Sequence, residues 1–543
     1  MTIPQDDHHR LRIVDPATGL RELDRSDIVV RKGQLTLLND SLTPEQARVE
    51  DLLAIADALS AAGIEYLLVR GDGTRSILAV DRARRRAVAA ALAVAFENEP
   101  FYSKAGSQSA VLVSDGRLSG SGKDRILRLF RPRVDLAGRL RYGAASGVGL
   151  EFWDFGETEI ITPAPNAVTR SRLPRAEALD ATVELYGREW ATLEGMFDPL
   201  ASDISFEIDI VFSWVDGSSA EFQRLRALRM QSYVVGAGDD SAARYRQLDE
   251  LKYALRSVHM FAPWIRHIFI VTDSPTPSWL AEHSDVTIVP STAFFQNPDD
   301  LPTHNSHAIE SQLHHIEGLS EHFLYSNDDM FFARPVGPDM FFSPGGISRF
   351  IESNTRIGLG TNSPERSGFE NAARVNRALL HGRFGRVTTR HLEHAPTPLR
   401  RSVLLEMERE FPVDFARTAA SPFRSETDIS VTNSFYHYYA LMTGRAVVQP
   451  AARVKYVETT LRSSLPQMRG LLRSRREDFF CLNDGSEPEI SIETRMDAVL
   501  AFLNAYFPIP APWEVPELAG FAQGTAEVVS PAAAQTASSP IRP

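Results

Sequence analysis

The chain has 543 residues, with 58 basic and 70 acidic side chains and a formal net charge of −12. Its length is sufficient for about three domains, and its acidic balance argues against a protein built to coat nucleic-acid phosphates. The single cysteine, Cys481, excludes an intramolecular disulfide framework and a cysteine-based zinc site.

Hydropathy and composition predict where the protein works and how it divides. The single cysteine fits a reducing compartment, so we expect a cytoplasmic protein. No window reaches the roughly 18 consecutive apolar residues of a transmembrane helix, and peripheral attachment to the inner membrane face stays open. We expect four segments: an N-terminal extension over 1–41, an accessory α/β domain of unassigned role over 42–200, a larger α/β domain over 201–508, and a disordered tail over 509–543.

The accessory domain mixes helical and strand patterns. Thr43 followed by Gln46 resembles a capping box, which predicts that a helix begins there. Further along, the pattern predicts a strand, an arginine-rich helix, three strands and a polar helix, over Ile64–Val69, Asp81–Phe96, Arg125–Phe130, Val148–Phe155, Thr158–Pro163 and Arg175–Phe197.

The larger domain alternates strands with helices, which predicts βαβ units and a mostly parallel sheet. Apolar runs predict strands at Ile208–Ser218, Ile268–Asp273 and Val286–Val289, and helical spacing relates Leu251 to Leu255. The strand His322–Ser326 is followed at once by three polar residues, Asn327, Asp328 and Asp329. Open α/β sheets bind ligands at such strand ends, although Asn and Asp are also common turn formers.

Two histidines, His304 and His307, precede this strand in the sequence His-Asn-Ser-His. They span an expected helix start with Asn305 or Ser306 as its N-cap, so they are better suited to a substrate-binding loop than to a zinc site.

Four blocks together resemble the Stealth sugar-phosphotransferases. This family includes bacterial capsule and exopolysaccharide phosphotransferases and the lysosomal-enzyme GlcNAc-1-phosphotransferase. The resemblance covers about half the chain, and its blocks are DIVFSWVDGS (Asp209–Ser218), the region Tyr245–Phe332 with YSNDDMFF at its end, HLEHAPTPLRRSVLLEMEREFP (His391–Pro412) with FRSETDIS (Phe423–Ser430), and FFCLND (Phe479–Asp484).

The resemblance implies a GT-A-like, Rossmann-related catalytic domain. The implied reaction moves a sugar 1-phosphate from a nucleotide-diphosphate sugar, expected to be UDP-linked, to a hydroxyl of a glycan acceptor, with release of a nucleoside monophosphate in capsule or exopolysaccharide synthesis. Two alternatives stay open: a metal-dependent glycosyltransferase that releases a nucleoside diphosphate, and a non-catalytic glycan-binding protein.

The implied chemistry is phosphoryl transfer, which needs a metal, a cationic clamp and a positioned base. Mg²⁺ or Mn²⁺ would be held by oxygen ligands from two blocks: Asp328, Asp329, Asn483 and Asp484. One of Asp328 and Asp329 could instead orient the acceptor hydroxyl. His394, which matches the family's catalytic position, is the expected base, with a proton-donor or helix-capping role as alternatives. It lies in a proline-stiffened loop before a helix expected near Leu399. Arg424 is the expected phosphate clamp.

Nine further residues are expected at the substrate site: Trp214, Asp216, Gly217, Arg256, His304, Asn305, His307, Glu310 and Arg400. Several have structural alternatives. Trp214 also suits a core position, Asp216 could cap a turn, Arg256 could form an ordinary ion pair, and Arg400 could cover a helix face.

Overall fold

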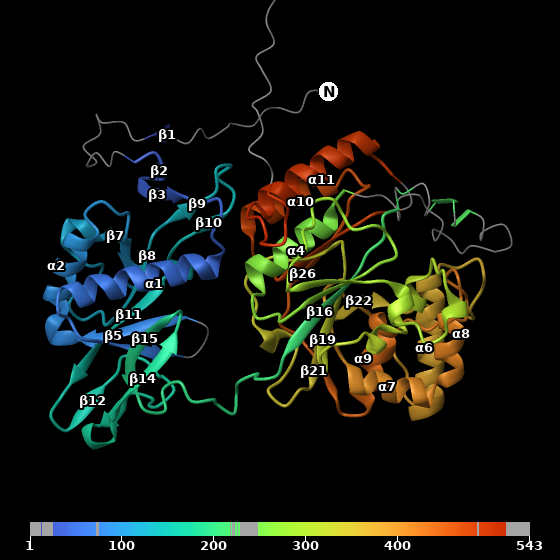
Figure 1. Ribbon diagram of the computed structural model, residues 1–543, viewed down its shortest axis with the longest axis horizontal. Coiled ribbons are helices and arrows are strands. Elements are labelled where there is room, and N and C mark those ends of the chain that lie inside the picture. The colour runs from blue at the N-terminus through green and yellow to red at the C-terminus, as the bar shows by residue number, and fades with distance from the viewer. Residues whose placement is uncertain are drawn as a thin grey trace, which may run out of the picture.

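The computed structural model describes residues 25–71, 75–217, 248–485 and 488–516, together with strand β1 and a few positions between 219 and 227. Figure 1 shows the elements up to β15 grouped on one side and those from β16 onward on the other. Within this described part, no helix is both long and apolar enough to cross a membrane.

The N-terminal group contains two larger sheets, a hairpin and two helices. One sheet has the order β1-β2-β3-β9-β10: Arg12–Ile13, Ile28–Arg31, Gln34–Leu38, Arg133–Val134 and Arg141–Tyr142. The other sheet contains β4 (Tyr66–Arg70), β5 (Ser76–Asp81), β6 (Tyr102–Lys104), β7 (Val111–Leu112), β8 (Ile126–Phe130), β11 (Val148–Phe155), β12 (Glu159–Ile161) and β13 (Arg172–Pro174). The helices are α1 (Pro44–Ala61) and α2 (Arg85–Ala95).

Local signals in this group mostly agree with the structure. Thr43 and Gln46 form the expected capping box at the start of α1, with both reciprocal hydrogen bonds present. The expected polar helix over 175–197 is wrong. Residues 180–193 form a hairpin of β14 (Asp180–Leu185) and β15 (Arg188–Leu193), turned at Tyr186 and Gly187, both with positive φ.

The expected boundaries also need correction. The segment treated as an N-terminal extension contributes β2 and β3, and β3 pairs with β9, so it belongs to the accessory fold. At the other end, residues 509–516 are ordered: Ile509 and Trp513 are buried in the core of the larger domain. Residues 1–11, 14–24 and 517–543, which complete the expected extension and tail, lie outside the described residues.

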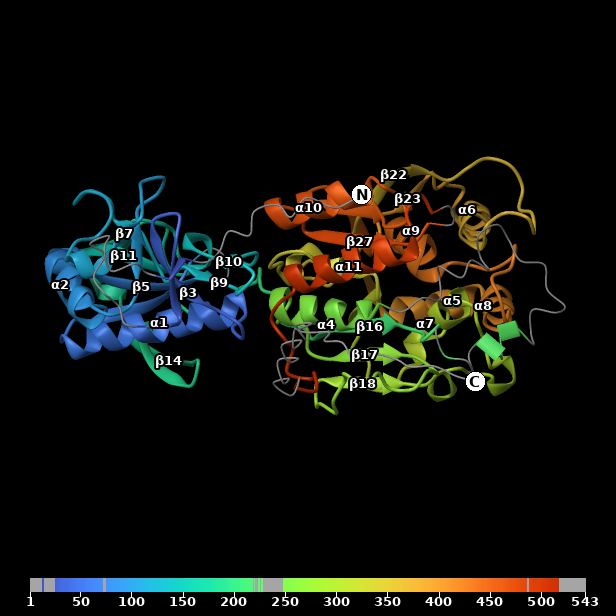
Figure 2. The same cartoon turned by 90° about the horizontal axis from the view of Figure 1, so that it is seen from above.

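The larger domain is α/β with a mostly parallel central sheet, as expected. Its order is β18-β17-β16-β19-β24, over Val286–Val289, Ile268–Val271, Ile208–Ser213, His322–Asn327 and Thr397–Arg400. Figure 2 shows β16, β17 and β18 side by side. The four parallel strands follow the chain order 3-2-1-4, so the direction of winding reverses between β16 and β19, and doubly wound sheets bind ligands at such a point.

Both faces of this sheet are buried, which explains its near-continuous apolar strands. Ile210 and Phe212 of β16 face one core with α4 (Glu250–Phe261), α10 (Ser464–Ser474) and α11 (Ile492–Tyr506). Val211 faces a second core formed with α7 (Arg401–Glu410), α8 (Pro412–Ala419) and α9 (Tyr436–Met442).

Smaller sheets and helices complete the domain. The strands are β20 (Met330–Phe332), β27 (Phe479–Asn483) and β26 (Val454–Glu458) in one sheet, β21 (Ser348–Phe350) with β25 (Ala446–Val448), and β22 (Glu352–Arg356) with β23 (Arg390–Leu392). The remaining helices include α5 (Ser306–Glu310), α6 (Gly368–Phe384), the one-turn 3-10 helix η9 (Leu313–His315) and the π-helical turn η11 (Val431–Phe435).

Candidate active site

Asn327 ends β19, and Asp328 and Asp329 form the turn to β20 at the carboxyl edge of the central sheet. β20 pairs antiparallel with β27, and the Leu482 amide donates to the Asp329 carbonyl over 3.0 Å. Continuing this register puts Asp328 opposite Asn483. The fold therefore brings together the two blocks that were expected to share a metal.

Glu250 joins these acids, although sequence reasoning missed it. It is the first residue of α4, and its carboxylate accepts a hydrogen bond from the Leu248 amide over 2.7 Å. Burial, and then the charge of Asp328, raise the pKa of Glu250 to about 7, with Asp484 contributing. Acidic residues are common in the first turn of a helix. The only sequence signal for Glu250 was therefore its place within the second Stealth-like block.

The two aspartates of the turn are protonated more readily than usual. Burial and the charge of Asp329 raise the pKa of Asp328 to about 7. Burial also raises the pKa of Asp329 to about 7, and the charge of Glu250 adds to this shift. The Cys481 thiol donates a hydrogen bond to Asp329 over 3.4 Å and lowers the pKa. Crowded carboxylates of this kind are stabilised in their charged form by a cation.

The donor set fits a hard divalent cation. Asp329 Oδ1 is buried and has no hydrogen-bond partner among the described residues, which is a costly state for a carboxylate oxygen without a ligand. Apart from the Cys481 thiol, the candidate ligands are carboxylate and amide oxygens, as Mg²⁺ and Mn²⁺ prefer. Asp484 is held by Arg495 over 2.6 Å and by the Thr459 hydroxyl, two contacts that the sequence did not indicate.

His394 lies at the same edge. β24 runs antiparallel to β19, with Thr397 opposite Tyr325. Continuing this register by three residues places the His394 backbone at the same height along the sheet as Asp328. The His394 ring packs against the Tyr456 ring, and Tyr456 is in register with Cys481 on β27. Burial lowers the pKa of His394 below its ordinary value near 6.5, so the imidazole is neutral at neutral pH.

His394 thus precedes a strand rather than the helix expected near Leu399. Residues 397–400 form β24, and α7 begins only at Arg401. Antiparallel pairing with β19 is what carries His394 to the carboxyl edge.

Arg424 approaches from the segment after α8. It donates to the Ser306 hydroxyl over 2.7 Å at the start of α5. A Cβ at Gly368 would lie 2.5 Å from Arg424 Cβ, so glycine at the first position of α6 makes room for this arginine. Asn305 is the N-cap of α5, as one of two expected candidates.

Tyr325 connects this basic side of the site to the acidic turn. Its hydroxyl donates to Asn327 Oδ1 over 3.0 Å. Burial raises its pKa well above the ordinary range, and the charges of Glu310, Arg424 and Asp328 all act on the same phenol. The sequence presented Tyr325 only as an apolar strand position, so its bridging place was missed.

Four expected substrate residues, in α5 or just before it, lie against other parts of the protein. The Asn305 amide donates to the carbonyls of Ser421 and Phe423 and to Asp428, so it is corrected from a substrate contact to an anchor for that segment. His307 is buried with Nδ1 3.7 Å from Asp428. Glu310 is buried and accepts from the Thr432 hydroxyl over 2.6 Å. The His304 ring stacks on Phe423 with 5.4 Å between centroids.

Arg256 and Arg400 are corrected as well. The Arg256 guanidinium is buried, donates to both carboxylate oxygens of Glu514 at 2.6 and 2.7 Å, and also donates to the Phe507 carbonyl. Arg400 is opposite His322, at the amino end of β19, and donates to Glu321 over 3.0 Å. Its position is at the other edge of the sheet from Asp328.

The Trp214–Gly217 turn follows β16 at the edge that carries the acids, because Ser213 pairs in parallel with Asn327. Trp214 itself is part of the core, 9% exposed. The Asp216 amide donates to Ser274 Oγ over 2.8 Å, which fixes the turn beside the point where the winding reverses.

Comparison with known families agrees with these blocks. Four regions match models of the Stealth protein: conserved region 1 at 206–234, region 2 at 244–350, region 3 at 393–441 and region 4 at 470–519. The matches cover the acidic turn, His394, Arg424 and Asp484. Region 4 also extends past the expected boundary at 508, in agreement with the ordered residues 509–516.

Whole-chain relatives are also similar. The exopolysaccharide phosphotransferase CpsY of Mycobacterium tuberculosis is 59% identical over 490 residues, which are 90% of this chain and 92% of that protein. An exopolysaccharide phosphotransferase of Nocardia farcinica is 53% identical over 500 residues, covering 92% of this chain and 93% of the relative.

Two of the solved structures that resemble the chain are glycosyltransferases. One is the galactosyltransferase LgtC, with a TM-score of 0.28, 11% identity, and coverage of 57% of this chain and 98% of the other. The other is the bifunctional glycosyltransferase WbbM, with a TM-score of 0.29, 10% identity and coverage of 58% and 53%. From the four matched regions and the near full-length relatives together, the chain belongs to the Stealth family.

Proposed function

We propose that this protein is a phosphotransferase of exopolysaccharide or capsule synthesis. It moves a sugar 1-phosphate from a nucleotide-diphosphate sugar, UDP-linked in our proposal, to a hydroxyl of a glycan acceptor. The names of its relatives support the reaction class. The products are a glycan phosphodiester and a nucleoside monophosphate, and the work is done from the cytoplasmic side.

One observation carries this proposal: the acids and the buried histidine converge at the carboxyl edge where the sheet reverses its winding. Asp328 and Asp329 follow β19, Asp484 follows β27, and His394 precedes β24, yet the strand registers bring all four to the same edge of the sheet. A glycan-binding protein needs neither crowded carboxylates nor a neutral buried imidazole at the same edge.

In the proposed reaction, the acceptor hydroxyl gives its proton to the neutral imidazole of His394. Its oxygen forms a bond to the phosphorus that carries the sugar. The bond from that phosphorus to the bridging oxygen of the diphosphate breaks, and the electron pair leaves with the nucleoside monophosphate. The anomeric C–O bond stays intact, so no glycosidase-type carboxylate pair is required.

Arg424 supports this step by holding phosphoryl oxygens. A planar guanidinium offers two parallel donors to a phosphate, and Ser306 and Gly368 fix where this one lies. Charge that develops on the transferred group is stabilised most by donors that are already in place.

Asp328 and Asp329 would hold Mg²⁺ or Mn²⁺, with Asn483, Asp484 and Glu250 beside them. Such a cation supplies positive charge that neutralises the diphosphate. The raised pKa values of Asp328, Asp329 and Glu250 mean that these acids release protons when a cation is bound.

The test is incubation of the full chain with a panel of nucleotide sugars, a glycan acceptor and Mg²⁺ or Mn²⁺. We expect release of nucleoside monophosphate and a new phosphodiester signal in ³¹P NMR, both formed at least about 100-fold more slowly with His394→Ala. Release of nucleoside diphosphate without a phosphodiester would identify a glycosyltransferase and refute the proposal. Saturable binding of the donor without turnover would identify a binding protein.

A further inference from the structure

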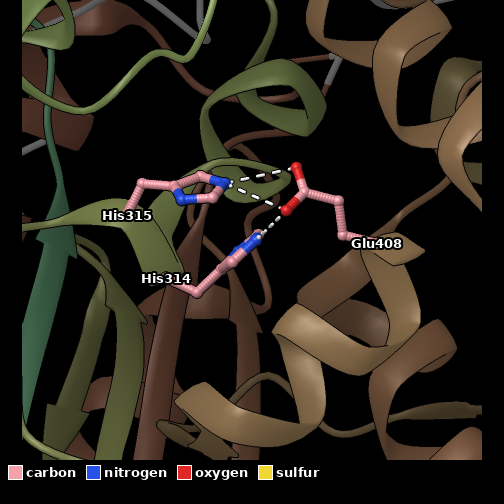
Figure 3. A group of neighbouring side chains, drawn as sticks. All are labelled: His314, His315 and Glu408. Atoms are coloured by element: carbon pink, nitrogen blue, oxygen red, sulfur yellow. Dashed lines mark hydrogen bonds and ion pairs between the residues drawn. The ribbon is translucent and has the colours of Figure 1, made fainter.

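Two histidines and a glutamate converge at a place that the phosphotransfer site does not use. His314 and His315 end the short helix η9, and Glu408 is on α7 (Figure 3). His314 Nε2 lies 3.0 Å from Glu408 Oε2, and His315 Nε2 lies 3.2 Å from Oε1 and 3.1 Å from Oε2. Among the described residues this is the group of His, Cys, Asp or Glu whose ligand atoms all lie within 4.8 Å of one another.

The cluster is separate from the acidic turn. η9 leads into β19 and α7 leads out of β24, and these strands meet at His322 and Arg400, the amino edge of β19. Asp328 and Asp329 follow the carboxyl edge. A ligand at the cluster therefore does not share the expected Mg²⁺ or Mn²⁺ site.

We infer that His314, His315 and Glu408 form a binding site for a borderline transition-metal ion, with Zn²⁺ as the best fit. Two imidazole nitrogens and one carboxylate are the ligand set of many three-residue zinc sites, which leave a fourth position to water. Zinc bonds of about 2.0–2.1 Å in a tetrahedron put neighbouring ligand atoms about 3.3–3.4 Å apart. The nitrogen–oxygen distances of 3.0 to 3.2 Å differ from that by only a few tenths of an ångström.

Metal binding requires neutral imidazoles beside a charged carboxylate. Burial lowers the pKa of His314. Burial alone would raise the pKa of Glu408, but the hydrogen bonds from both histidines outweigh it and bring that pKa to about 2. A bound metal would replace the Nε2 protons of these hydrogen bonds, and each neutral ring would then carry its proton on Nδ1. The cluster with neutral rings then carries one negative charge that a cation can compensate.

The cluster combines a rigid, dry side with an open side. The His314 side chain is fully buried, its ring meets Phe415 of α8 edge-on at 6.1 Å, and Arg401 donates to its carbonyl over 2.8 Å. His315 and Glu408 are 14% and 25% exposed, so an ion can reach them from solvent. Such packing holds one ligand in place and leaves the fourth position accessible.

A metal here would clamp η9 to α7. η9 directly follows α5, which contacts Arg424, and α7 directly follows β24, which carries the His394 loop. The ion would thus stabilise the scaffold behind the site without taking part in phosphoryl transfer. Imidazole ligands select zinc over the magnesium that an all-oxygen site prefers, so the two sites are chemically distinguishable.

The test uses the full chain, stripped with a chelator and kept in excess Mg²⁺ so that the acidic turn is saturated. Titration with Zn²⁺ alone should show one tight equivalent by calorimetry, and Zn²⁺ should raise the melting temperature. Co²⁺ in its place should give the visible absorption of a tetrahedral site. Two variants change the cluster: Glu408→Gln keeps the side-chain shape and one acceptor oxygen, and His315→Ala alters a partly exposed position. His381→Ala, on the exposed side of α6, is the matched control.

We expect the tight equivalent, the thermal shift and the Co²⁺ absorption in the unchanged protein and in His381→Ala. Loss of a residue that only supports a metal ligand lowers metal affinity by ~10–100-fold. Glu408→Gln and His315→Ala change a ligand itself, so each should weaken Zn²⁺ binding by at least this factor. Equal Zn²⁺ affinity in the unchanged protein and Glu408→Gln would overturn the inference, as would absence of a tight equivalent in the unchanged protein.

Discussion

The ring of His394 packs against the ring of Tyr456, with 5.0 Å between centroids and 56° between planes. Tyr456 pairs in register with Cys481, whose thiol donates to Asp329. This chain of contacts ties the candidate base to the candidate metal edge.

Replacement of His394 by alanine should lower kcat by roughly 100- to 10,000-fold, the usual contribution of a positioned general base. Tyr456→Phe retains the ring against His394, so its kcat should stay within a few-fold of the unchanged enzyme. Steady-state assay of nucleotide release checks both, with circular dichroism to confirm folding. A full kcat in His394→Ala would remove this residue from the chemistry.

The pH dependence should separate His394 from the acids. Burial disfavours the imidazolium and lowers the pKa of His394 below 6.5. At saturating metal, kcat should therefore fall to half its maximum only at a pH below 6.5. The acids of the turn have pKa values of about 7, so protons compete with metal as the pH falls through 7 and the half-saturating Mg²⁺ concentration should rise steeply. Mg²⁺ titrations at several pH values measure both quantities. A half-saturating concentration that is constant from pH 8 to 6 would contradict the assigned ligands.

Asp328→Asn should stabilise the metal-free protein while abolishing turnover. The pKa of Asp328 is raised from an ordinary value near 4 to about 7, so between those values the native state holds a proton that the unfolded chain has lost. Stability therefore falls as pH rises through this window and stays lower above it. We expect a gain of about 1–2 kcal/mol at pH 7.5, allowing for solvent screening, that shrinks toward zero near pH 4.

Urea unfolding in chelator at several pH values measures this gain. Asp497→Asn, at an exposed position of α11, is the matched control and should show no pH-dependent gain. An Asp328→Asn protein that is less stable than the unchanged protein at pH 7.5 would mean that the carboxylates are not under mutual repulsion.

Arg424→Lys should lower kcat/KM by about 10- to 100-fold, because lysine keeps the charge but loses the planar pair of donors. Ser306→Ala removes only the hydroxyl that Arg424 donates to, so it should have a smaller effect in the same assay. If lysine at 424 were as active as arginine, a bidentate contact with phosphate would be excluded.

Glu514→Gln should destabilise the fold without altering the chemistry. It leaves the buried Arg256 guanidinium without its carboxylate partner, and breaking a buried pair in this way costs about 3–5 kcal/mol. Thermal melts should show the loss, whereas kcat per folded molecule at low temperature should change little. The exposed Glu282→Gln is the control. Unchanged stability together with a large rise in KM would restore Arg256 to substrate binding.

Local signals in the sequence determined much of the fold. Val148–Phe155 and Val286–Val289 are strands with the bounds that their apolar runs predict, and the capping box at Thr43 starts a helix. These features depend on residues a few positions apart, where backbone preference and one buried face decide the outcome. The failure over 175–197 had the same origin, because a polar hairpin alternates too weakly to be distinguished from a helix.

The chemistry of the candidate site was also readable as residue types in family blocks: Asp328, Asp329, His394, Arg424 and Asp484. What spacing could not show was which groups already had partners. Arg256 is occupied by Glu514, 258 positions away, and Arg400 is at the far end of β19. Glu250 and Tyr325 entered the site only through α4 and the strand register.

The sequence by itself thus determined the elements, the α/β class and the kinds of side chain available for phosphoryl transfer. The tertiary structure alone decided that β24 is antiparallel to β19, that β20 pairs with β27, and hence that His394 and Asp484 lie at the same edge of the sheet as Asp328. The reason is physical: strand pairing between distant segments is set by burial of both sheet faces at once, and no local pattern carries that information.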